Sequence, residues 1–335
     1  MSAEAPLLEV RDLKVHFSLK VRRGLLPPMV LKAVDGVSFR VAPGETLGVV
    51  GESGCGKSTL GRAVLQLIPA TAGEVVWLGR PIQGLDAKEM RPLRRDMQII
   101  FQDPLAALDP RMTVGEIIGE PLDTYLPSIS KAEGKARVEE MLAKVGLSPH
   151  MLNRYPHEFS GGQCQRIGIA RAMILNPKLV VCDEPVSALD VSIQAQIINL
   201  LMRLQREFNL SLILISHDLS VVRHICHRIL VLYLGRVMEV ASRDELYASP
   251  RHPYTQALIS AVPIPDPDLE AAKPRIVLSG DLPSPFEPPS GCLFRTRCPK
   301  ATALCAEVVP PEERLSATHR VACHHWRDRS GAARS

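Results

Sequence analysis

A glycine-rich segment carries the residue types and spacing that bind phosphate groups. It runs from Gly51 to Ser58, fits the template Gly-x4-Gly-Lys-Ser, and lies between a strand pattern and a helix pattern. Backbone N–H groups of such a loop converge on phosphate oxygens, while Lys57 would reach the β and γ phosphates and Ser58 would bind Mg²⁺. The segment predicts a nucleoside triphosphate site. Its predicted binding residues are Gly51, Glu52, Ser53, Gly54, Cys55, Gly56, Lys57, Ser58 and Thr59.

A second glycine turn lies at the start of another predicted helix. Its residues are Ser160, Gly161, Gly162 and Gln163, and the helix pattern runs from Gln163 to Leu175. Taken alone, Ser160 is most simply interpreted as the N-cap of this helix. The segments that follow it in the sequence change that interpretation.

Polar residues end the next two strand patterns. The apolar run from Lys178 to Cys182 is followed by two adjacent carboxylates, and the run from Leu212 to Ile215 leads to a histidine. Such groups hold Mg²⁺ and orient the attacking water in phosphoryl transfer. A glutamine after an earlier strand pattern and an aspartate after Leu189 complete the set. These residues are Gln102, Asp183, Glu184, Asp190 and His217.

The ordered set of motifs resembles the ATP-binding-cassette (ABC) ATPases, with their Walker A, Q-loop, signature, Walker B, D-loop and H-loop motifs. The resemblance implies an α/β fold, a RecA-like P-loop NTPase with an antiparallel β-subdomain and a helical insert. It also implies that Asp183 holds Mg²⁺ through water, together with Ser58 and Gln102. Glu184 would act as the general base or orient the attacking water, and His217 would contact the γ phosphate.

The same resemblance implies that ATP is held between two chains. Walker A comes from one subunit, and Ser160, Gly161, Gly162 and Gln163 come from its partner. This chain has one of each motif, so it is expected to be half of an ATPase pair. The D-loop residue Asp190 would lie across the interface and couple the two sites.

The resemblance divides the chain into three regions. An ABC ATPase domain is predicted at residues 7–258, with its helical subdomain at about 105–165, followed by an extension at 259–327 and a disordered tail at 328–335. The strand patterns are Leu7 to Val10, Lys14 to Ser18, Val37 to Val41, Glu45 to Val50, Glu74 to Leu78, Met97 to Phe101 and the hairpin Ile229 to Val240. The further helix patterns are Ser58 to Ile68, Val114 to Glu120 and Lys131 to Val145.

Three C-terminal segments resemble the extension of ATP-binding subunits from peptide importers, most closely those of oligopeptide importers. They are Pro250 to Leu258, Leu278 to Pro285 and Gly291 to Pro299. The resemblance implies a second, related ATPase as partner, two transmembrane permeases, an external peptide-binding protein acting indirectly, and a peripheral place on the cytoplasmic face of the inner membrane. The alternatives are a dipeptide, nickel or other small-solute importer, or a soluble ABC ATPase acting on ribosomes or DNA. The latter usually fuses two cassettes or inserts coiled coils, and this chain does neither.

Composition favours a subunit that reaches the membrane only through partners. The chain has 335 residues, 46% of them hydrophobic, without an apolar run near the length of a membrane span, about 18 residues. The N-terminus lacks the basic and apolar pattern of a signal peptide. The net charge of +4 is spread along the chain and aromatics make up 4%, so no nucleic-acid partner is expected.

The eight cysteines fall into two groups. Cys55, Cys164, Cys182 and Cys226 are scattered and are expected to be free thiols. The other four follow a proline-rich stretch with the spacing C-x5-C-x6-C-x17-C, in a segment that needs a staple because it has little helix or sheet of its own. They are Cys292, Cys298, Cys305 and Cys323.

Four thiolates suit either Zn²⁺ or an iron–sulfur cluster. The gaps between these cysteines exceed the usual zinc spacing, and the resemblance to peptide-importer ATPases implies a four-iron four-sulfur (4Fe-4S) cluster, with Zn²⁺ as the alternative. Disulfides are disfavoured in a reducing compartment, and four unligated thiols are the remaining interpretation. His319, His324 and His325 are candidate substitute ligands, or ordinary exposed histidines.

The residue that stacks on adenine has no clear candidate. The segment Leu25 to Val30, where the family usually places an aromatic side chain, contains none. Phe17 would serve if the strand register allows it, and a core position in that strand is the competing interpretation.

Overall fold

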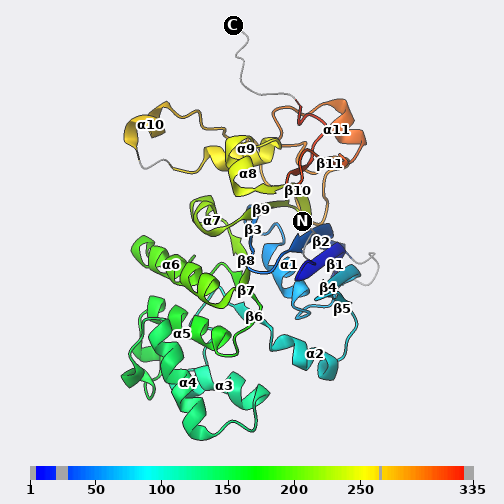
Figure 1. Ribbon diagram of the computed structural model, residues 1–335. Coiled ribbons are helices and arrows are strands. Elements are labelled where there is room, and N and C mark those ends of the chain that lie inside the picture. Colours follow the sequence, from blue (N-terminus) through cyan, green and yellow to red (C-terminus); the bar gives the residue numbers. More distant parts are fainter. Residues whose placement is uncertain (1–4, 20–28, 264–265, 328–335) are drawn as a thin grey trace. The chain divides into compact units, whose positions relative to one another are not determined.

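The computed structural model describes residues 5–19, 29–263 and 266–327, which divide into two units (Figure 1). Unit 1 is drawn from residues 5–8, 41–46 and 77–216, and unit 2 from 9–19, 29–40, 47–76, 217–263 and 266–327. The predicted tail at 328–335 and most of the segment searched for an adenine-stacking residue lie outside the described residues.

Unit 1 contains three parallel strands in the order β8-β7-β6. They are β6 (Met97–Ile100), β7 (Leu179–Asp183) and β8 (Ser211–Ser216). Every residue of β7 and β8 is buried, which explains the unbroken apolar runs in the sequence. Ile100 pairs with Cys182 and Asp183 with Ile215, so the carboxyl ends of the three strands lie at one edge.

Helices make up most of the rest of unit 1. Helix α3 packs against α4 and α5, and α5 also contacts α6 and β6 (Figure 1). Thr113 caps α3 and Ser130 caps α4, each accepting a hydrogen bond from the backbone N–H of a glutamate three residues later. The remaining elements of the unit are β5 (Arg80–Pro81), α2 (Ala87–Arg94), α3 (Val114–Tyr125), α4 (Lys131–Lys144), η1 (Pro149–Met151), η2 (Pro156–Glu158), α5 (Gly161–Met173) and α6 (Val191–Phe208).

Unit 2 carries two sets of strands. The first set has the order β2-β1-β4, with β1 at Leu8–Leu19, β2 at Met29–Val41 and β4 at Ala72–Trp77. The sequence predicted two strands where β1 runs as one. Asp12 at φ 45° interrupts the extended backbone there without ending the strand.

The second set has the order β11-β12-β10-β9-β3. β9 runs parallel to β3, whereas β10 pairs antiparallel with both β9 and β12. One strand of the C-terminal extension, β12, therefore pairs with the predicted hairpin, and β11 pairs with β12. The strands are β3 (Thr46–Val50), β9 (Arg228–Tyr233), β10 (Arg236–Ser242), β11 (Glu312–Arg314) and β12 (Arg320–Ala322).

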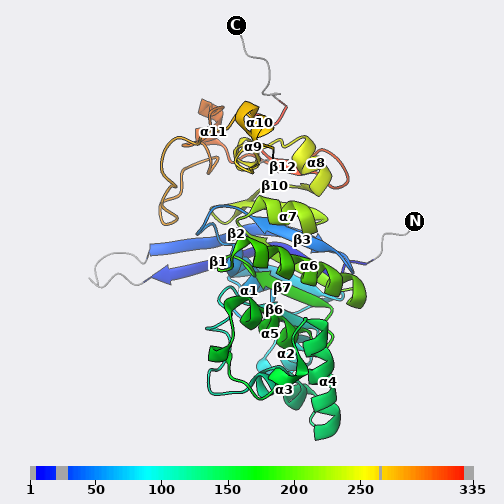
Figure 2. The same ribbon diagram turned by 90° about the vertical axis from the view of Figure 1, so that its left-hand side faces the viewer.

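Short helices surround these strands. Helices α8 and α9 pack against β10 (Figure 2). No helix in the described part of the chain combines the length and apolar character that a membrane crossing requires. The helices of unit 2 are α1 (Lys57–Val64), α7 (Leu219–Ile225), α8 (Arg243–Ala248), α9 (Pro253–Ser260), α10 (Pro267–Ala272) and α11 (Ala303–Glu307).

Candidate nucleotide site

The phosphate-binding loop follows the fully buried strand β3 and opens helix α1. Two of its glycines are required by close backbone contacts. A Cβ atom on Gly51 would lie 2.1 Å from the carbonyl oxygen of Leu232, and one on Gly56, at φ 103°, would lie 2.0 Å from that of Ala33. Only glycine fits at these two positions. Ser53 and Gly54 between them are exposed, so a ligand can reach the tip of the loop.

Lys57 is buried inside this loop. Its ammonium donates to the carbonyl oxygens of Gly51 (2.8 Å) and Glu52 (3.0 Å), and only 5% of the residue is exposed. Ser58 and Thr59 are half-buried in the first turn of α1. The loop therefore carries a fixed cation next to the helix N-terminus, the arrangement that favours a bound phosphate.

The two predicted carboxylates follow β7 in unit 1. Asp183 is the last residue of the strand and is 1% exposed. Glu184 has φ 47°, a left-handed conformation that costs about 1 kcal/mol or more for a residue other than glycine. Its N–H donates to the carbonyl of Ile215 (3.0 Å), and Ser187 Oγ donates to its carbonyl oxygen (3.2 Å). These bonds hold the turn that directs the Glu184 side chain.

Gln102 meets Glu184 directly. Gln102 Nε2 donates to Glu184 Oε2 at 3.1 Å, although 82 residues separate the two in sequence. The contact arises because β6 and β7 are parallel neighbours, so residues that follow their carboxyl ends reach the same edge. The structure thus brings together two of the three residues predicted to act in catalysis.

The signature turn begins helix α5 in unit 1. Ser160 Oγ accepts from the N–H of Gln163, and Gln163 Oε1 accepts from the N–H of Ser160, forming a capping box. Ser160 is therefore an N-cap, as its sequence context alone indicated. Ser160 and Gly161 are exposed, so the helix N-terminus is open to an external ligand.

The D-loop packs beside this turn. A Cβ atom on Gly161 would lie 3.5 Å from Leu189, and one on Gly162 would lie 2.6 Å from Ile193. Asp190 is the N-cap residue of α6 and is exposed, and the next residue, Val191, is 81% exposed. The signature and D-loop form one exposed surface of unit 1.

His217 lies in unit 2, directly before α7, and its side chain is exposed. The next residue, Asp218, caps α7 by accepting from the N–H groups of Ser220 and Val221. The predicted site residues are therefore divided. The phosphate-binding loop and His217 belong to unit 2, and Gln102, the carboxylates, the signature and the D-loop belong to unit 1.

Comparisons with known proteins show which family the chain belongs to. Residues 34–187 match the ABC transporter family, and residues 238–305 match the oligopeptide/dipeptide transporter C-terminal region. The oligopeptide transport ATP-binding protein OppF of Salmonella typhimurium is 62% identical over 319 residues, 95% of each chain. AppF of Bacillus subtilis, with the same description, is 54% identical over 95% of this chain and 97% of its own. The chain belongs to the oligopeptide transport ATP-binding proteins.

Solved structures agree with this assignment. The ATP-binding cassette MJ0796, described as a dimer in a post-hydrolysis state bound to ADP and Pi, is 29% identical with a TM-score of 0.63. It is matched over 70% of this chain and 98% of its own. CbiO1 of Clostridium perfringens, part of an ABC transporter complex, has 26% identity and the same TM-score over 73% and 92%. The ABC ATPase fold expected from the motifs is confirmed.

The four tail cysteines do not form the expected metal site. Burial, and then the neighbouring Cys292, Cys298 and Cys305, raise the pKa of Cys323 to about 11. The backbone N–H of Cys292 donates to the carbonyl oxygen of Cys305 at 2.8 Å, so these two residues are neighbours. Within the described residues, however, no three His, Cys, Asp or Glu side chains are placed where they could hold a metal ion, and no cysteine is in a disulfide. The structure does not support the predicted iron–sulfur or zinc staple.

The three nearby histidines have other partners. His319 Nε2 lies 2.7 Å from Oε1 of the fully buried Glu239, His325 lies 3.0 Å from Thr302 Oγ1, and His324 Nε2 lies 3.0 Å from the carbonyl oxygen of Val308. The Nε2 atom of each histidine therefore already has a polar partner in the protein.

Aromatic packing and strand pairing attach the extension to the rest of unit 2. Phe294 is fully buried, with ring centroids 5.4 Å from Tyr233 and 5.3 Å from Tyr254. The ring contacts pack the extension against β9 and α9, and β12 pairs with β10. The extension is thus held by aromatic contacts and strand pairing.

Three residues of unit 2 received no role from the sequence. Tyr254 and Arg297 contact Glu52, and the carboxylate of Glu239 accepts from two backbone N–H groups before α9. Tyr254 and Arg297 lie in two of the segments that resemble peptide-importer extensions, but that resemblance assigned them no contact with the loop. Phe17, the candidate for adenine stacking, is half-buried in β1.

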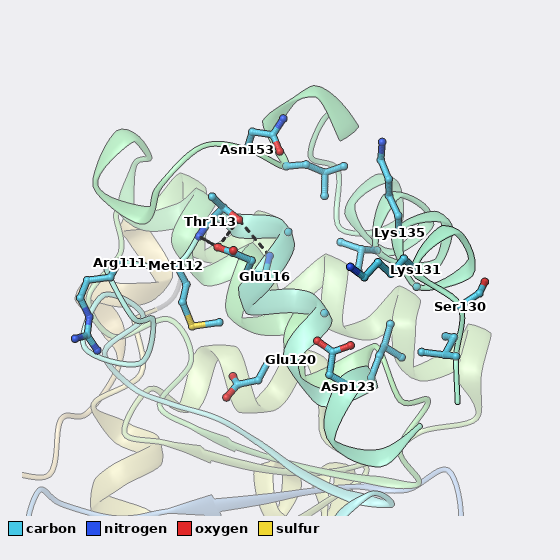
Figure 3. Close-up of a pocket in the computed structure, with 17 residues that line it drawn as sticks. Arg111, Met112, Thr113, Glu116, Glu120, Asp123, Ser130, Lys131, Lys135 and Asn153 are labelled. Atoms are coloured by element: carbon cyan, nitrogen blue, oxygen red, sulfur yellow. Dashed lines mark hydrogen bonds between the residues drawn. The ribbon is translucent and has the colours of Figure 1, made fainter. Parts of the chain in front are cut away.

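A groove of about 720 Å³ lies on the helical insert (Figure 3). Glu120 and Asp123 from α3 lie on one side and Lys131 and Lys135 from α4 on the other. Gly134 also lines it, with open space within 4 Å of where its Cβ would be. The groove therefore presents both charges and has room for an inserted segment.

Proposed function

We propose that the chain hydrolyses ATP to drive the import of oligopeptides, as a peripheral subunit on the cytoplasmic face of the inner membrane. The proposal of hydrolysis rests on Glu184, which directly follows the buried Asp183 and accepts a hydrogen bond from Gln102. The cargo follows from relatives described as oligopeptide transport and peptide import ATP-binding proteins.

Each site residue has a role in this proposal. Lys57 and the loop N–H groups bind the phosphates, and Ser58, Asp183 and Gln102 would hold Mg²⁺, which neutralises charge on the phosphates when bound. The oxygen atoms of these three side chains are the donors that Mg²⁺ prefers. Glu184 accepts a proton from the attacking water or orients it, and His217 contacts the γ phosphate.

A second ATPase chain completes the site in this proposal. The exposed signature and D-loop surface supports it, because Ser160, Gly161 and Asp190 are all exposed and the signature turn packs beside the D-loop. The N-terminus of α5 is therefore open to a phosphate group from outside the chain. Ser160, Gly161, Gly162 and Gln163 would then contact ATP held by the partner's Walker A.

Reconstitution tests the function as a whole. The chain is coexpressed with a related ATPase and two permeases, and the complex is placed in vesicles together with an external peptide-binding protein. We expect uptake of a labelled oligopeptide that requires ATP. Copurification with ribosomes or DNA and no association with permeases would contradict the proposal.

The groove on the helical insert is proposed to receive a cytoplasmic segment of a permease. Gly134→Trp should fill the groove and abolish copurification of the permeases, whereas ATP binding should be unchanged. The matched control is Gly134→Ala, which adds only a methyl group and favours the helix by about 1 kcal/mol. Pull-down with tagged permeases measures both variants. Full assembly and peptide uptake by Gly134→Trp would remove the groove from the interface.

We also propose that the four tail cysteines take up a 4Fe-4S cluster, with Zn²⁺ as the second candidate. The spacing of the four cysteines and the backbone hydrogen bond between Cys292 and Cys305 support this, and no step of ATP hydrolysis depends on it. Anaerobic purification should give about four irons per chain. Cys298→Ser should lose them and Cys226→Ser, which changes a core cysteine, should not. Zinc without iron would replace the cluster, and neither metal would contradict both candidates.

A further inference from the structure

The C-terminal extension reaches the phosphate-binding loop at Glu52. Arg297 Nη1 donates to Glu52 Oε2 at 2.6 Å and Arg297 Nη2 to Glu52 Oε1 at 3.0 Å, so the ion pair is bidentate. The backbone N–H of Glu52 donates to Tyr254 Oη at 2.9 Å. Both the side chain and the backbone of one loop residue are therefore held by residues beyond the ATPase motifs.

This ion pair is shielded from water. The Arg297 side chain is 9% exposed and that of Glu52 is 29% exposed. A bidentate pair between a planar guanidinium and a carboxylate fixes distance and orientation together. Partial burial reduces screening, so this contact differs from the exposed ion pairs elsewhere on the chain, which contribute little.

Arg297 is itself held on a rigid frame. Three residues before it, Phe294 packs against Tyr233 and Tyr254. Tyr233 ends β9, and β9 pairs in parallel with β3, the strand that leads into the loop. The guanidinium is thus anchored to the same strands that set the start of the loop.

We propose that Arg297 is a positioning residue for ATP binding, which neutralises Glu52 and fixes it within the phosphate-binding loop. The inference rests on the proposed binding of ATP. A triphosphate brings several negative charges to a loop that already contains the Glu52 carboxylate. Without Arg297 that carboxylate is uncompensated and opposes the phosphates, and the loop loses a tether. The extension therefore sets the affinity of the ATPase for its nucleotide.

Titration of the full-length chain with ATP tests this inference. Arg297→Gln should weaken ATP affinity about tenfold, equivalent to about 1.4 kcal/mol. Glu52→Gln should bind ATP more tightly than the unchanged chain, because it removes the opposing charge. In the double variant Glu52→Gln with Arg297→Gln, the ATP affinity should return to within about threefold of that of the unchanged chain. Arg297→Lys keeps the positive charge but cannot form the bidentate pair. Its ATP affinity should lie between those of Arg297→Gln and the unchanged chain.

Arg295→Gln is the matched control. Within the described residues, the side chain of Arg295 donates hydrogen bonds only to Ser290. This variant should bind ATP normally. Thermal unfolding of each variant shows whether the chain is folded. Equal losses in Arg297→Gln, Glu52→Gln and the double variant would indicate structural support alone and overturn the inference, as would normal binding by folded Arg297→Gln. An unchanged chain that does not bind ATP would contradict the proposed function instead.

Discussion

Glu184→Gln is expected to stop ATP turnover and leave ATP binding intact. The hydrogen bonds that hold the Glu184 backbone at φ 47° do not involve its carboxylate, so the substitution should preserve the turn. The amide cannot accept a proton, whereas the carboxylate that contacts Gln102 can. We expect hydrolysis to fall about a hundredfold or more, at least about 3 kcal/mol. Phosphate release from the assembled transporter and nucleotide binding measure the two effects separately.

Glu207→Gln provides the control for this substitution. Glu207 pairs with Lys144 on the surface of the same unit, so its change removes a carboxylate of equal size from a place without a proposed role. Its hydrolysis should match that of the unchanged transporter. Near-normal turnover by Glu184→Gln would remove Glu184 from the mechanism.

The parallel strands beside Asp183 and Glu184 were predictable because their signal is local. β7 and β8 are buried along their whole length, and buried parallel strands read as continuous apolar runs. Helix α1 shows the limit of such signals. The pattern predicted a helix to Ile68, but α1 ends at Val64 because Gln66 adopts φ 54° before the expected stop at Pro69.

Long-range pairing explains what the sequence could not predict. The extension was expected to need a metal because its proline-rich segments offered no periodic pattern. The structure instead pairs β12 with β10 and buries Phe294 between rings from distant segments. Arg297 and Glu52 lie 245 residues apart, and no spacing rule connects them. Helix α6 was also not assigned, although its 18 residues bury an apolar face that includes Ile197, Leu201 and Leu204.

The signature turn gives the strongest test of the two-chain site, and the structure decides which glycine to change. A Cβ atom at Gly162 would lie 2.6 Å from Ile193, so a substitution there also disturbs packing. At Gly161 the nearest atom would be 3.5 Å away, an ordinary contact. Gly161→Asp therefore adds a negative charge at the exposed helix N-terminus without a clash. Gly168→Asp is the control, because it places the same charge further along α5 in open space.

Gly161→Asp should impair the ATP site whose Walker A belongs to the partner ATPase. The added carboxylate would replace a favourable helix N-terminus with a charge that repels the γ phosphate, and we expect about a hundredfold loss of hydrolysis at that site. Complexes in which this chain carries Lys57→Ala report only the partner's Walker A site. Their remaining turnover should be lost with Gly161→Asp and kept with Gly168→Asp. If Gly161→Asp instead harms only ATP bound to its own Lys57, ATP is not held between two chains, and the signature acts within one subunit.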